Sequence, residues 1–127
     1  MNTTTQRAVL IRAYGGAAAA EIAEIARPAA GPGQVLVRVR AAGVNGIDWK
    51  VREGFVRDAF PLQLPAVLGI ELAGTVEALG PGASRFRVGD RVMGPQGGLG
   101  AYADVVAVDQ ANLVRTPQGL DDVHAAG

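Results

Sequence analysis

The chain has 127 residues, a formal net charge of zero at pH 7 and no cysteine. This length predicts a single domain, and the lack of cysteine excludes disulfides and thiolate metal sites and fits a cytoplasmic protein. Because the sequence has no basic run, neither nucleic acid nor an anionic membrane is expected as a partner. No apolar run approaches the ~20 residues that a membrane-spanning helix needs.

The first half of the chain predicts strands followed by one short helix. Residues 7–13 (RAVLIRA) and 34–41 (QVLVRVRA) have the alternation that is typical of strands. Residues 18–25 alternate only weakly and fit either a strand or a short helix, because alanine favours helix. Asn45 is a favourable N-cap residue, so a short helix is expected over residues 46–52.

The second half of the chain continues with short apolar segments between glycine-rich turns. Strands are predicted over residues 71–79, 90–93, 102–108 and 112–115. Residues 97–100 (GGLG) lack the following Lys-Ser or Lys-Thr of a phosphate-binding loop, so we expect a hairpin turn there. A last helix is predicted over residues 120–126. Many short strands joined by glycine turns are typical of a β-barrel or a sandwich.

Four segments of the sequence occur in the order in which a known family carries them: residues 33–39 (GQVLVRV), 43–54 (GVNGIDWKVREG), 65–74 (PAVLGIELAG) and 98–108 (GLGAYADVVAV). Together they resemble the N-terminal, GroES-like catalytic domain of the medium-chain dehydrogenases and reductases. The resemblance implies a mainly β fold with short helices, arranged as a GroES-like partly open β-barrel. It also implies that residues 1–127 form the substrate-side domain of a hydride-transferring enzyme.

Two positions within this resemblance indicate a branch of the family. Zinc-dependent alcohol dehydrogenases carry a cysteine where Asn45 stands and a histidine where Ile70 stands, and both bind the catalytic zinc. An amide is a poor zinc ligand and isoleucine is none, so no metal is expected. The chain therefore resembles the zinc-independent quinone oxidoreductases, the zeta-crystallin-like branch. That branch implies NADPH as the cofactor and a quinone or an enone as the substrate.

The resemblance also implies a second domain that this sequence does not contain. Members of the family carry a Rossmann domain that binds the nicotinamide cofactor, and no strand, glycine turn and helix here could replace it. We therefore expect the Rossmann domain to be absent from this chain and the isolated chain to be inactive. The surface facing that domain is expected to be apolar and to favour self-association, for example as a homodimer.

Three residues near the start of the predicted helix are candidates for the site. Asn45 is expected to be catalytic, because without zinc a substrate carbonyl must be polarised by hydrogen-bond donors. The same asparagine is a good N-cap, and the two roles can coexist. Asp48 and Lys50 are expected in the substrate and cofactor cleft. Asp48 also suits the positive end of a helix, and Lys50 fits a solvated surface equally well.

Aromatic and acidic residues complete the candidate set. Tyr14 and Phe55 are expected to line the cleft, and Trp49 fits either an aromatic pocket or the core. Glu71 lies among apolar residues, and a buried carboxylate needs a partner because isolated charge burial is costly. We predict a structural ion pair between Glu71 and Arg91.

Two other functions fit the same fold class. A stand-alone GroES-like module that assembles into a ring, as co-chaperonins do, would use a mobile polar loop, whereas the loops here are short and rich in glycine. Alternatively, the chain is one subunit of a split reductase, completed by a separate Rossmann polypeptide. The oligomeric state tests the first alternative, and a neighbouring reading frame for a nucleotide-binding domain tests the second.

Overall fold

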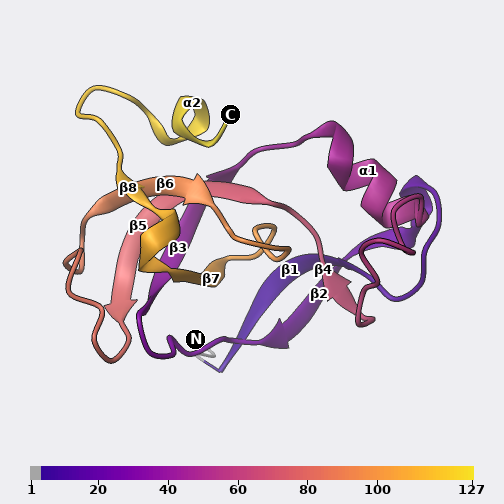
Figure 1. Cartoon of the computed structure of the whole chain (residues 1–127), viewed down its shortest axis with the longest axis horizontal. Coiled ribbons are helices and arrows are strands. Elements are labelled where there is room, and N and C mark those ends of the chain that lie inside the picture. Colours follow the sequence, from indigo (N-terminus) through magenta and orange to yellow (C-terminus); the bar gives the residue numbers. More distant parts are fainter. Residues whose placement is uncertain (1–3) are drawn as a thin grey trace.

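The computed structural model describes residues 4–127 and consists mainly of short strands (Figure 1). The strands span Thr5–Ile11 (β1), Ala20–Ala26 (β2), Gln34–Ala42 (β3), Ala66–Val67 (β4), Glu71–Leu79 (β5), Arg91–Pro95 (β6), Val105–Asp109 (β7) and Val114–Arg115 (β8). They form two antiparallel sheets, with the orders β2-β1-β4 and β7-β3-β5-β6-β8. The mainly β fold is confirmed, and the two sheets do not close into one complete barrel.

Strand β3 lies inside the five-stranded sheet, between β7 and β5, because its first half is apolar on both faces. Val35 and Val37 have no exposed surface, and Leu36 on the opposite face is only 9% exposed. Burying one such side chain contributes about 1.5–3 kcal/mol to the free energy of unfolding. Strands β5 and β7 pair with β3 on its two sides. This sheet therefore carries the larger core cluster of the domain.

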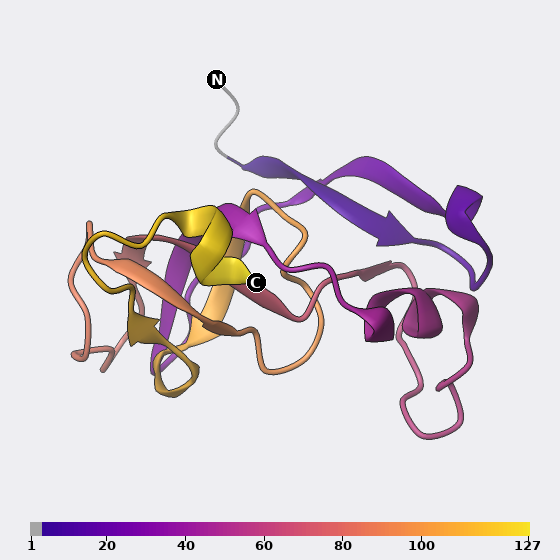
Figure 2. The same ribbon diagram turned by 90° about the horizontal axis from the view of Figure 1, so that it is seen from above.

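Helix α1 (Gly46–Glu53) is held against the three-stranded sheet by a second, smaller cluster. Ile11 of β1, Val51 of α1 and Leu68 beside β4 are all buried there. Tyr14 and Leu62 pack against the same cluster and bring in the loop that follows the helix. Figure 2 shows α1 and this loop at one end of the molecule, beside the hairpin of β1 and β2. The cluster fixes where the start of α1 lies.

Helix α2 (Asp122–Ala126) is short and packs against the larger sheet. It contacts β3, β5 and β6, and the side chain of Asp121 caps it by accepting a hydrogen bond from the His124 N–H (2.8 Å). The placement of the helix agrees with the prediction for residues 120–126. Among residues 4–127, no helix is long and apolar enough to cross a membrane.

Several element boundaries differ from the sequence-based prediction, for local reasons. The ambiguous segment 18–25 divides into a 3-10 turn at Ala17–Ala19 and the strand β2. The predicted strand 102–108 begins only at Val105, because the residues before it bond to β1 instead. The Val9 N–H donates to the Tyr102 carbonyl (2.8 Å), which draws this segment across to the other sheet. Likewise, the predicted strand 112–115 shortens to β8 because a 3-10 turn occupies Gln110–Asn112.

The hairpin predicted at residues 97–100 is wrong. Strands β6 and β7 flank this segment in sequence, but β3 and β5 lie between them in the sheet. The loop instead bonds back to the segment before β5: the Gly100 N–H donates to the Gly69 carbonyl (2.9 Å), and the Gln96 N–H to that of Ile70 (2.8 Å). The glycine run therefore forms a crossover loop beside Ile70.

Candidate functional site

Asn45 lies where the chain leaves β3 and enters α1. Its backbone is extended, with φ −124° and ψ 160°, as an N-cap residue requires. The Asp48 N–H donates to the backbone carbonyl of Asn45 (3.0 Å), and the Asp48 Oδ2 accepts from the Asn45 N–H (2.7 Å). The two residues pair as in a capping box, although the Asp48 N–H donates to the backbone oxygen of Asn45. Its side chain is thereby left for another contact.

That contact is a hydrogen bond to Glu71, the first residue of β5. The Asn45 Nδ2 donates to the Glu71 Oε1 at 2.9 Å, and both side chains are half-buried. A carboxylate only accepts, so the amino end of the amide must face Glu71. Nδ2 carries a second hydrogen that makes no hydrogen bond to another described residue. Asn45 can therefore offer one further donor to a ligand.

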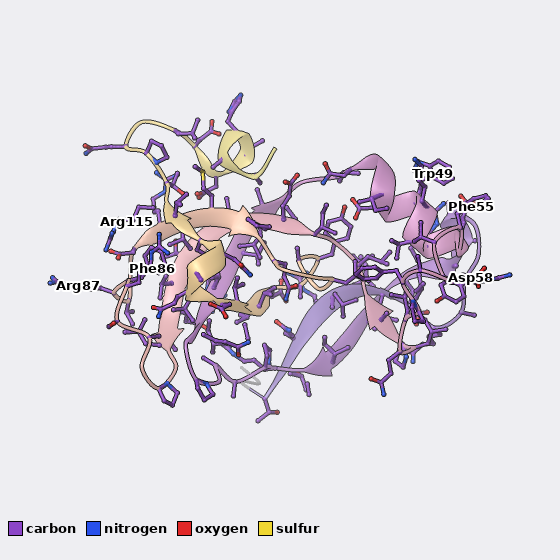
Figure 3. All side chains as sticks on the ribbon, viewed as in Figure 1. Trp49, Phe55, Asp58, Phe86, Arg87 and Arg115 are labelled. Carbon is purple, nitrogen blue, oxygen red and sulfur yellow. The ribbon has the colours of Figure 1, made fainter. Side chains whose placement is uncertain are left out.

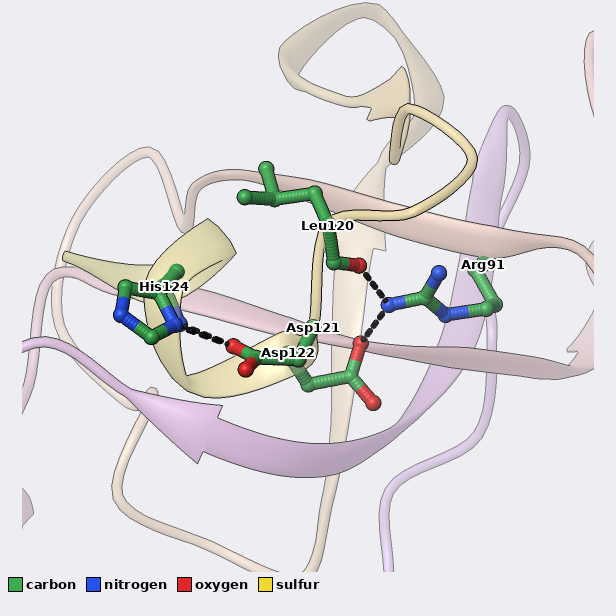
Figure 4. A network of polar contacts seen from close by, with 5 residues as sticks. All are labelled: Arg91, Leu120, Asp121, Asp122 and His124. Carbon is green, nitrogen blue, oxygen red and sulfur yellow. Dashed lines mark hydrogen bonds and ion pairs between the residues drawn. The ribbon is translucent and has the colours of Figure 1, made fainter.

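The predicted ion pair between Glu71 and Arg91 is wrong, for a reason of register. Strands β5 and β6 pair with Thr75 opposite Arg91 and with Glu71 opposite Pro95. Four strand residues, or about 13 Å, therefore separate the two side chains along the sheet. Arg91 instead donates to the Leu120 carbonyl (2.6 Å) and to Asp122 (2.9 Å), and so anchors the start of α2 (Figure 4).

Asp48 is buried, and its Oδ2 accepts a second hydrogen bond from the hydroxyl of Tyr102. Tyr102 is not among the site residues that the sequence predicted. The Tyr102 hydroxyl lies 2.8 Å from the Asp48 Oδ2 and 3.1 Å from the Gly43 carbonyl oxygen. Burial first, and then the hydrogen bond to Asp48 and the negative charges of Asp48 and Glu71, raise the pKa of Tyr102 well above its ordinary value. The phenol therefore stays protonated and acts as a donor at neutral pH.

Two of the other predicted site residues, Lys50 and Phe55, lie in a separate aromatic group around Trp49. The rings of Trp49 and Phe55 meet edge to face, with centroids 5.6 Å apart at 83°. The Lys50 Nζ lies 5.8 Å from the centroid of Trp49, so Lys50 is not paired with Asp48. Tyr14 joins neither group: its hydroxyl accepts from the Leu62 N–H (3.2 Å) and holds the loop after α1.

An apolar pocket of about 260 Å³ has walls that include residues neighbouring Asn45 and Glu71 in the sequence. Its lining is formed by Ile47, Val51, Val56, Ala59, Phe60, Ile70, Gly98 and Leu99. Ile70 directly precedes Glu71 and Ile47 follows Asn45 by two residues, so the polar pair stands next to the apolar wall. None of the predicted site residues lines this pocket. The available signal was Ile70, which occupies the position of a zinc ligand in the resembled family.

A larger groove of about 450 Å³ runs between β1, β2 and the segment that follows β3. Its charged residues, Arg7 and Asp104, are bonded to each other, with the Arg7 N–H donating to the Asp104 Oδ2 at 3.0 Å. The remaining lining is mostly apolar and open, and includes Val44, which is 84% exposed. The groove thus lacks the uncommitted donor that Asn45 provides beside the smaller pocket.

Comparison with known proteins places the sequence in a family. Residues 31–118, which are more than half of the chain, match the alcohol dehydrogenase GroES-like domain. The chain belongs to this family. Its relatives include quinone oxidoreductases of the medium-chain dehydrogenase/reductase superfamily. The predicted family is therefore confirmed.

Individual relatives of this GroES-like domain are substantially longer than the chain. A quinone oxidoreductase of Pseudomonas aeruginosa is 43% identical over 115 residues, which cover 90% of the chain and 34% of that protein. A 2-haloacrylate reductase of a Burkholderia species is 41% identical over 99 residues, or 76% of the chain and 30% of that protein. The chain thus spans about a third of the length of these relatives.

Solved structures agree with the fold. The human synaptic vesicle membrane protein VAT-1 homolog-like protein superimposes with a TM-score of 0.91 at 34% identity, covering 96% of the chain and 38% of that protein. The quinone oxidoreductase of Escherichia coli, solved in complex with NADPH, gives a TM-score of 0.87 at 29% identity, covering 94% of the chain and 36% of that protein. Both again match over little more than a third of their length.

The residues of the site do not fit the zinc ion that the family name suggests. The carboxylates in contact with Asn45 are those of Glu71 and Asp48, the second of which is bonded to the Asn45 N–H and to Tyr102, and Ile70 presents only an apolar side chain. Within residues 4–127, no group of three or more His, Cys, Asp or Glu side chains is arranged to hold a metal. We therefore assign no chemical step to a metal at this site.

Proposed function

We propose that this GroES-like domain is the substrate side of an NADPH-dependent quinone or enone reductase that works without zinc. The observation that carries the proposal is the free N–H of Asn45, held by Glu71 next to an apolar pocket. The relatives support it, since quinone oxidoreductases recur among them and one was solved with NADPH. A Rossmann domain, outside this chain or on a separate polypeptide, would complete the cleft.

In this proposal the apolar pocket holds the body of the substrate and Asn45 holds its oxygen. NADPH would supply a hydride to the carbon conjugated to the carbonyl, and the two electrons would move onto the carbonyl oxygen. The second N–H of Asn45 can donate to that oxygen as its negative charge develops. A proton from solvent then completes the reduction. A ring of quinone size matches a pocket of about 260 Å³ whose lining is apolar.

The same donor also fits the carboxamide of a nicotinamide, since Asn45 can orient either carbonyl. Of the predicted cleft residues, Lys50 is exposed beside Trp49 and available to the cofactor or the substrate. Asp48 is committed to the backbone of Asn45 and to Tyr102. Tyr14 and Phe55 shape the loop and the aromatic group at the rim. These assignments place the chemistry on Asn45 and the supporting contacts around it.

The proposal is tested by joining the chain to the part of a relative that it does not match. A fusion in which this chain replaces the matched third of the Pseudomonas aeruginosa relative should oxidise NADPH in the presence of a small quinone. Asn45→Ala should lower kcat by about 10²-fold, as loss of one oxyanion donor does, while the free energy of unfolding falls by only about 1–2 kcal/mol.

Gln34→Ala is the matched control, because the half-buried Gln34 side chain also has a single hydrogen-bond partner among the described residues, the Gly31 N–H at 2.9 Å, but lies outside the pocket. It should leave kcat unchanged. Full turnover in the Asn45→Ala fusion would refute the assignment of Asn45. Tight binding of NADPH by the isolated 127-residue chain, followed by nicotinamide fluorescence, would refute the need for a second domain.

A further inference from the structure

We infer that Tyr102 and Glu71 are positioning residues that hold Asn45 in the orientation needed for hydride transfer. The inference rests on the proposed function and extends it to two residues that need touch neither substrate nor cofactor. Both act through the Asn45 cluster, which consists of Gly43, Asn45, Asp48, Glu71 and Tyr102. The cluster joins three segments that are distant in the sequence: the end of β3, the start of β5 and the approach to β7.

The two ends of Asn45 are held by different partners. Its side chain is fixed by Glu71 (2.9 Å), and its backbone N–H is fixed by the Asp48 Oδ2 (2.7 Å). Tyr102 holds this second contact in place, because its hydroxyl reaches the same Asp48 oxygen (2.8 Å). The hydroxyl also lies 3.1 Å from the Gly43 carbonyl, two residues before Asn45. A displacement of about 1 Å at a reacting group can cost 10²-fold in rate, so these contacts bear on turnover.

Asp48 is arranged for this task at a cost in stability. The residue is only 7% exposed, and its Oδ1 is buried without a hydrogen-bond partner. Its Oδ2 accepts from both Asn45 and Tyr102. A buried carboxylate that satisfies only one of its oxygens is unfavourable for folding. Its contribution is therefore geometric: it couples the Tyr102 hydroxyl to the backbone of Asn45.

Two glycines leave room for the two positioning side chains. A Cβ on Gly69, whose φ is +99°, would stand 2.5 Å from the Tyr102 Cδ1. A Cβ on Gly43 would overlap the Glu71 Oε1. Real Cβ atoms do not approach so closely, so larger residues at either position would displace Tyr102 or Glu71. The backbone thus accommodates both contacts to Asn45.

The first test is made on the intact 127-residue chain by NMR, with exchange of the Asn45 amide hydrogens with water as the readout. Glu71→Ala should speed exchange of the Nδ2 hydrogens about tenfold, and Glu71→Gln should restore most of the protection because its carbonyl still accepts. Tyr102→Phe keeps the ring and should speed exchange of the Asn45 backbone N–H severalfold. Thr116→Val, which removes a buried hydroxyl that has no partner, should change neither rate.

The second test uses the fusion enzyme. Tyr102→Phe and Glu71→Ala should each lower kcat about tenfold with KM for the quinone within about twofold, as expected for misplacement of a donor. Glu71→Gln should recover most of kcat, and Thr116→Val should retain all of it. Unchanged Asn45 exchange in both variants, or changed exchange with an unmoved kcat, would overturn the inference. Full turnover of the Asn45→Ala fusion would instead overturn the proposed function itself.

Discussion

The two ends of the molecule keep their aromatic side chains in opposite environments (Figure 3). At the α1 end, Trp49 and Phe55 contact each other while remaining 43% and 70% exposed. At the far end, Phe86 is 2% exposed and lies between two guanidinium groups, Arg85 at 5.7 Å and Arg115 at 5.3 Å. The far end buries its aromatic ring in the core, whereas the α1 end leaves its two rings exposed on the surface.

Among the described residues, each end leaves one buried polar oxygen without a hydrogen-bond partner, but the oxygen is a carboxylate oxygen of Asp48 at the α1 end and the hydroxyl of Thr116 at the far end. At the far end, Arg115 bonds the Arg85 carbonyl (3.0 Å) and pairs with Asp90 (3.5 Å). At the α1 end, the Asp48 Oδ1 is buried without a partner, and Asn45 keeps one N–H for a ligand. Incomplete satisfaction of polar groups is typical of functional sites, where stability is given up for chemistry. A buried carboxylate costs more to leave unsatisfied than a hydroxyl does, so this difference supports our proposal that the site lies at the α1 end.

Of the substitutions that test the difference between the two ends, Phe86→Ala is expected to have the largest effect on stability. Phe86→Ala should lower the free energy of unfolding by about 3–5 kcal/mol, because it leaves a cavity in the core and removes the ring that both arginines cover. Urea denaturation of the isolated chain measures this change. A loss below about 1 kcal/mol would show that the far end is not the stabilising one.

A second prediction concerns alkaline pH and the Asn45 cluster. The pKa of Tyr102 in the folded chain lies above the ordinary value of 10.0, so the folded state holds this proton more tightly than the unfolded state. The resulting stabilisation is complete below about pH 10 and declines as the pH rises toward the folded value. Between the unfolded and folded pKa values the loss approaches ~1.4 kcal/mol per pH unit. Partial solvation of the phenol shortens the pH range over which stability is lost and leaves this slope unchanged.

Denaturation of the wild-type chain and of Tyr102→Phe at about pH 9 and about pH 11 measures this effect. The stability of the wild type should fall further than that of the variant, since the variant has no hydroxyl at this position to ionise. Thr116→Val keeps Tyr102 and should therefore follow the wild type. Equal slopes for the wild type and Tyr102→Phe would show that the hydroxyl is not held as the structure indicates.

Local features of the fold could be predicted from the sequence because neighbouring residues decide them. The alternating valines of β3 predicted its strand, and Asn45 predicted the start of α1 with Asp48 in its first turn. These elements depend on propensity, capping and side-chain period, all of which lie within a few residues. The family resemblance supplied the rest of the architecture.

Contacts between distant segments could not be predicted in the same way. Tyr102 and Asp48 are 54 residues apart, and only the crossing of residues 102–104 to β1 brings the phenol to the helix start. Whether Arg91 could pair with Glu71 depended on the register of β5 and β6. That register places Arg91 opposite Thr75, at the other end of the paired strands. Register and crossover follow from the whole sheet, so residue types alone identified the cluster only in part.

The smallest effect on stability is expected at the exposed end. Phe55→Ala should change the free energy of unfolding by less than about 0.5 kcal/mol, because the ring is 70% exposed and buries little surface on folding. The same substitution should weaken self-association, which we expect of the isolated chain because Trp49, Phe55 and Phe60 are all exposed near the same helix. Sedimentation over a range of concentrations measures it. If the wild type remained monomeric throughout, these rings would not form a contact surface, and the contrast between the two ends would reduce to packing alone.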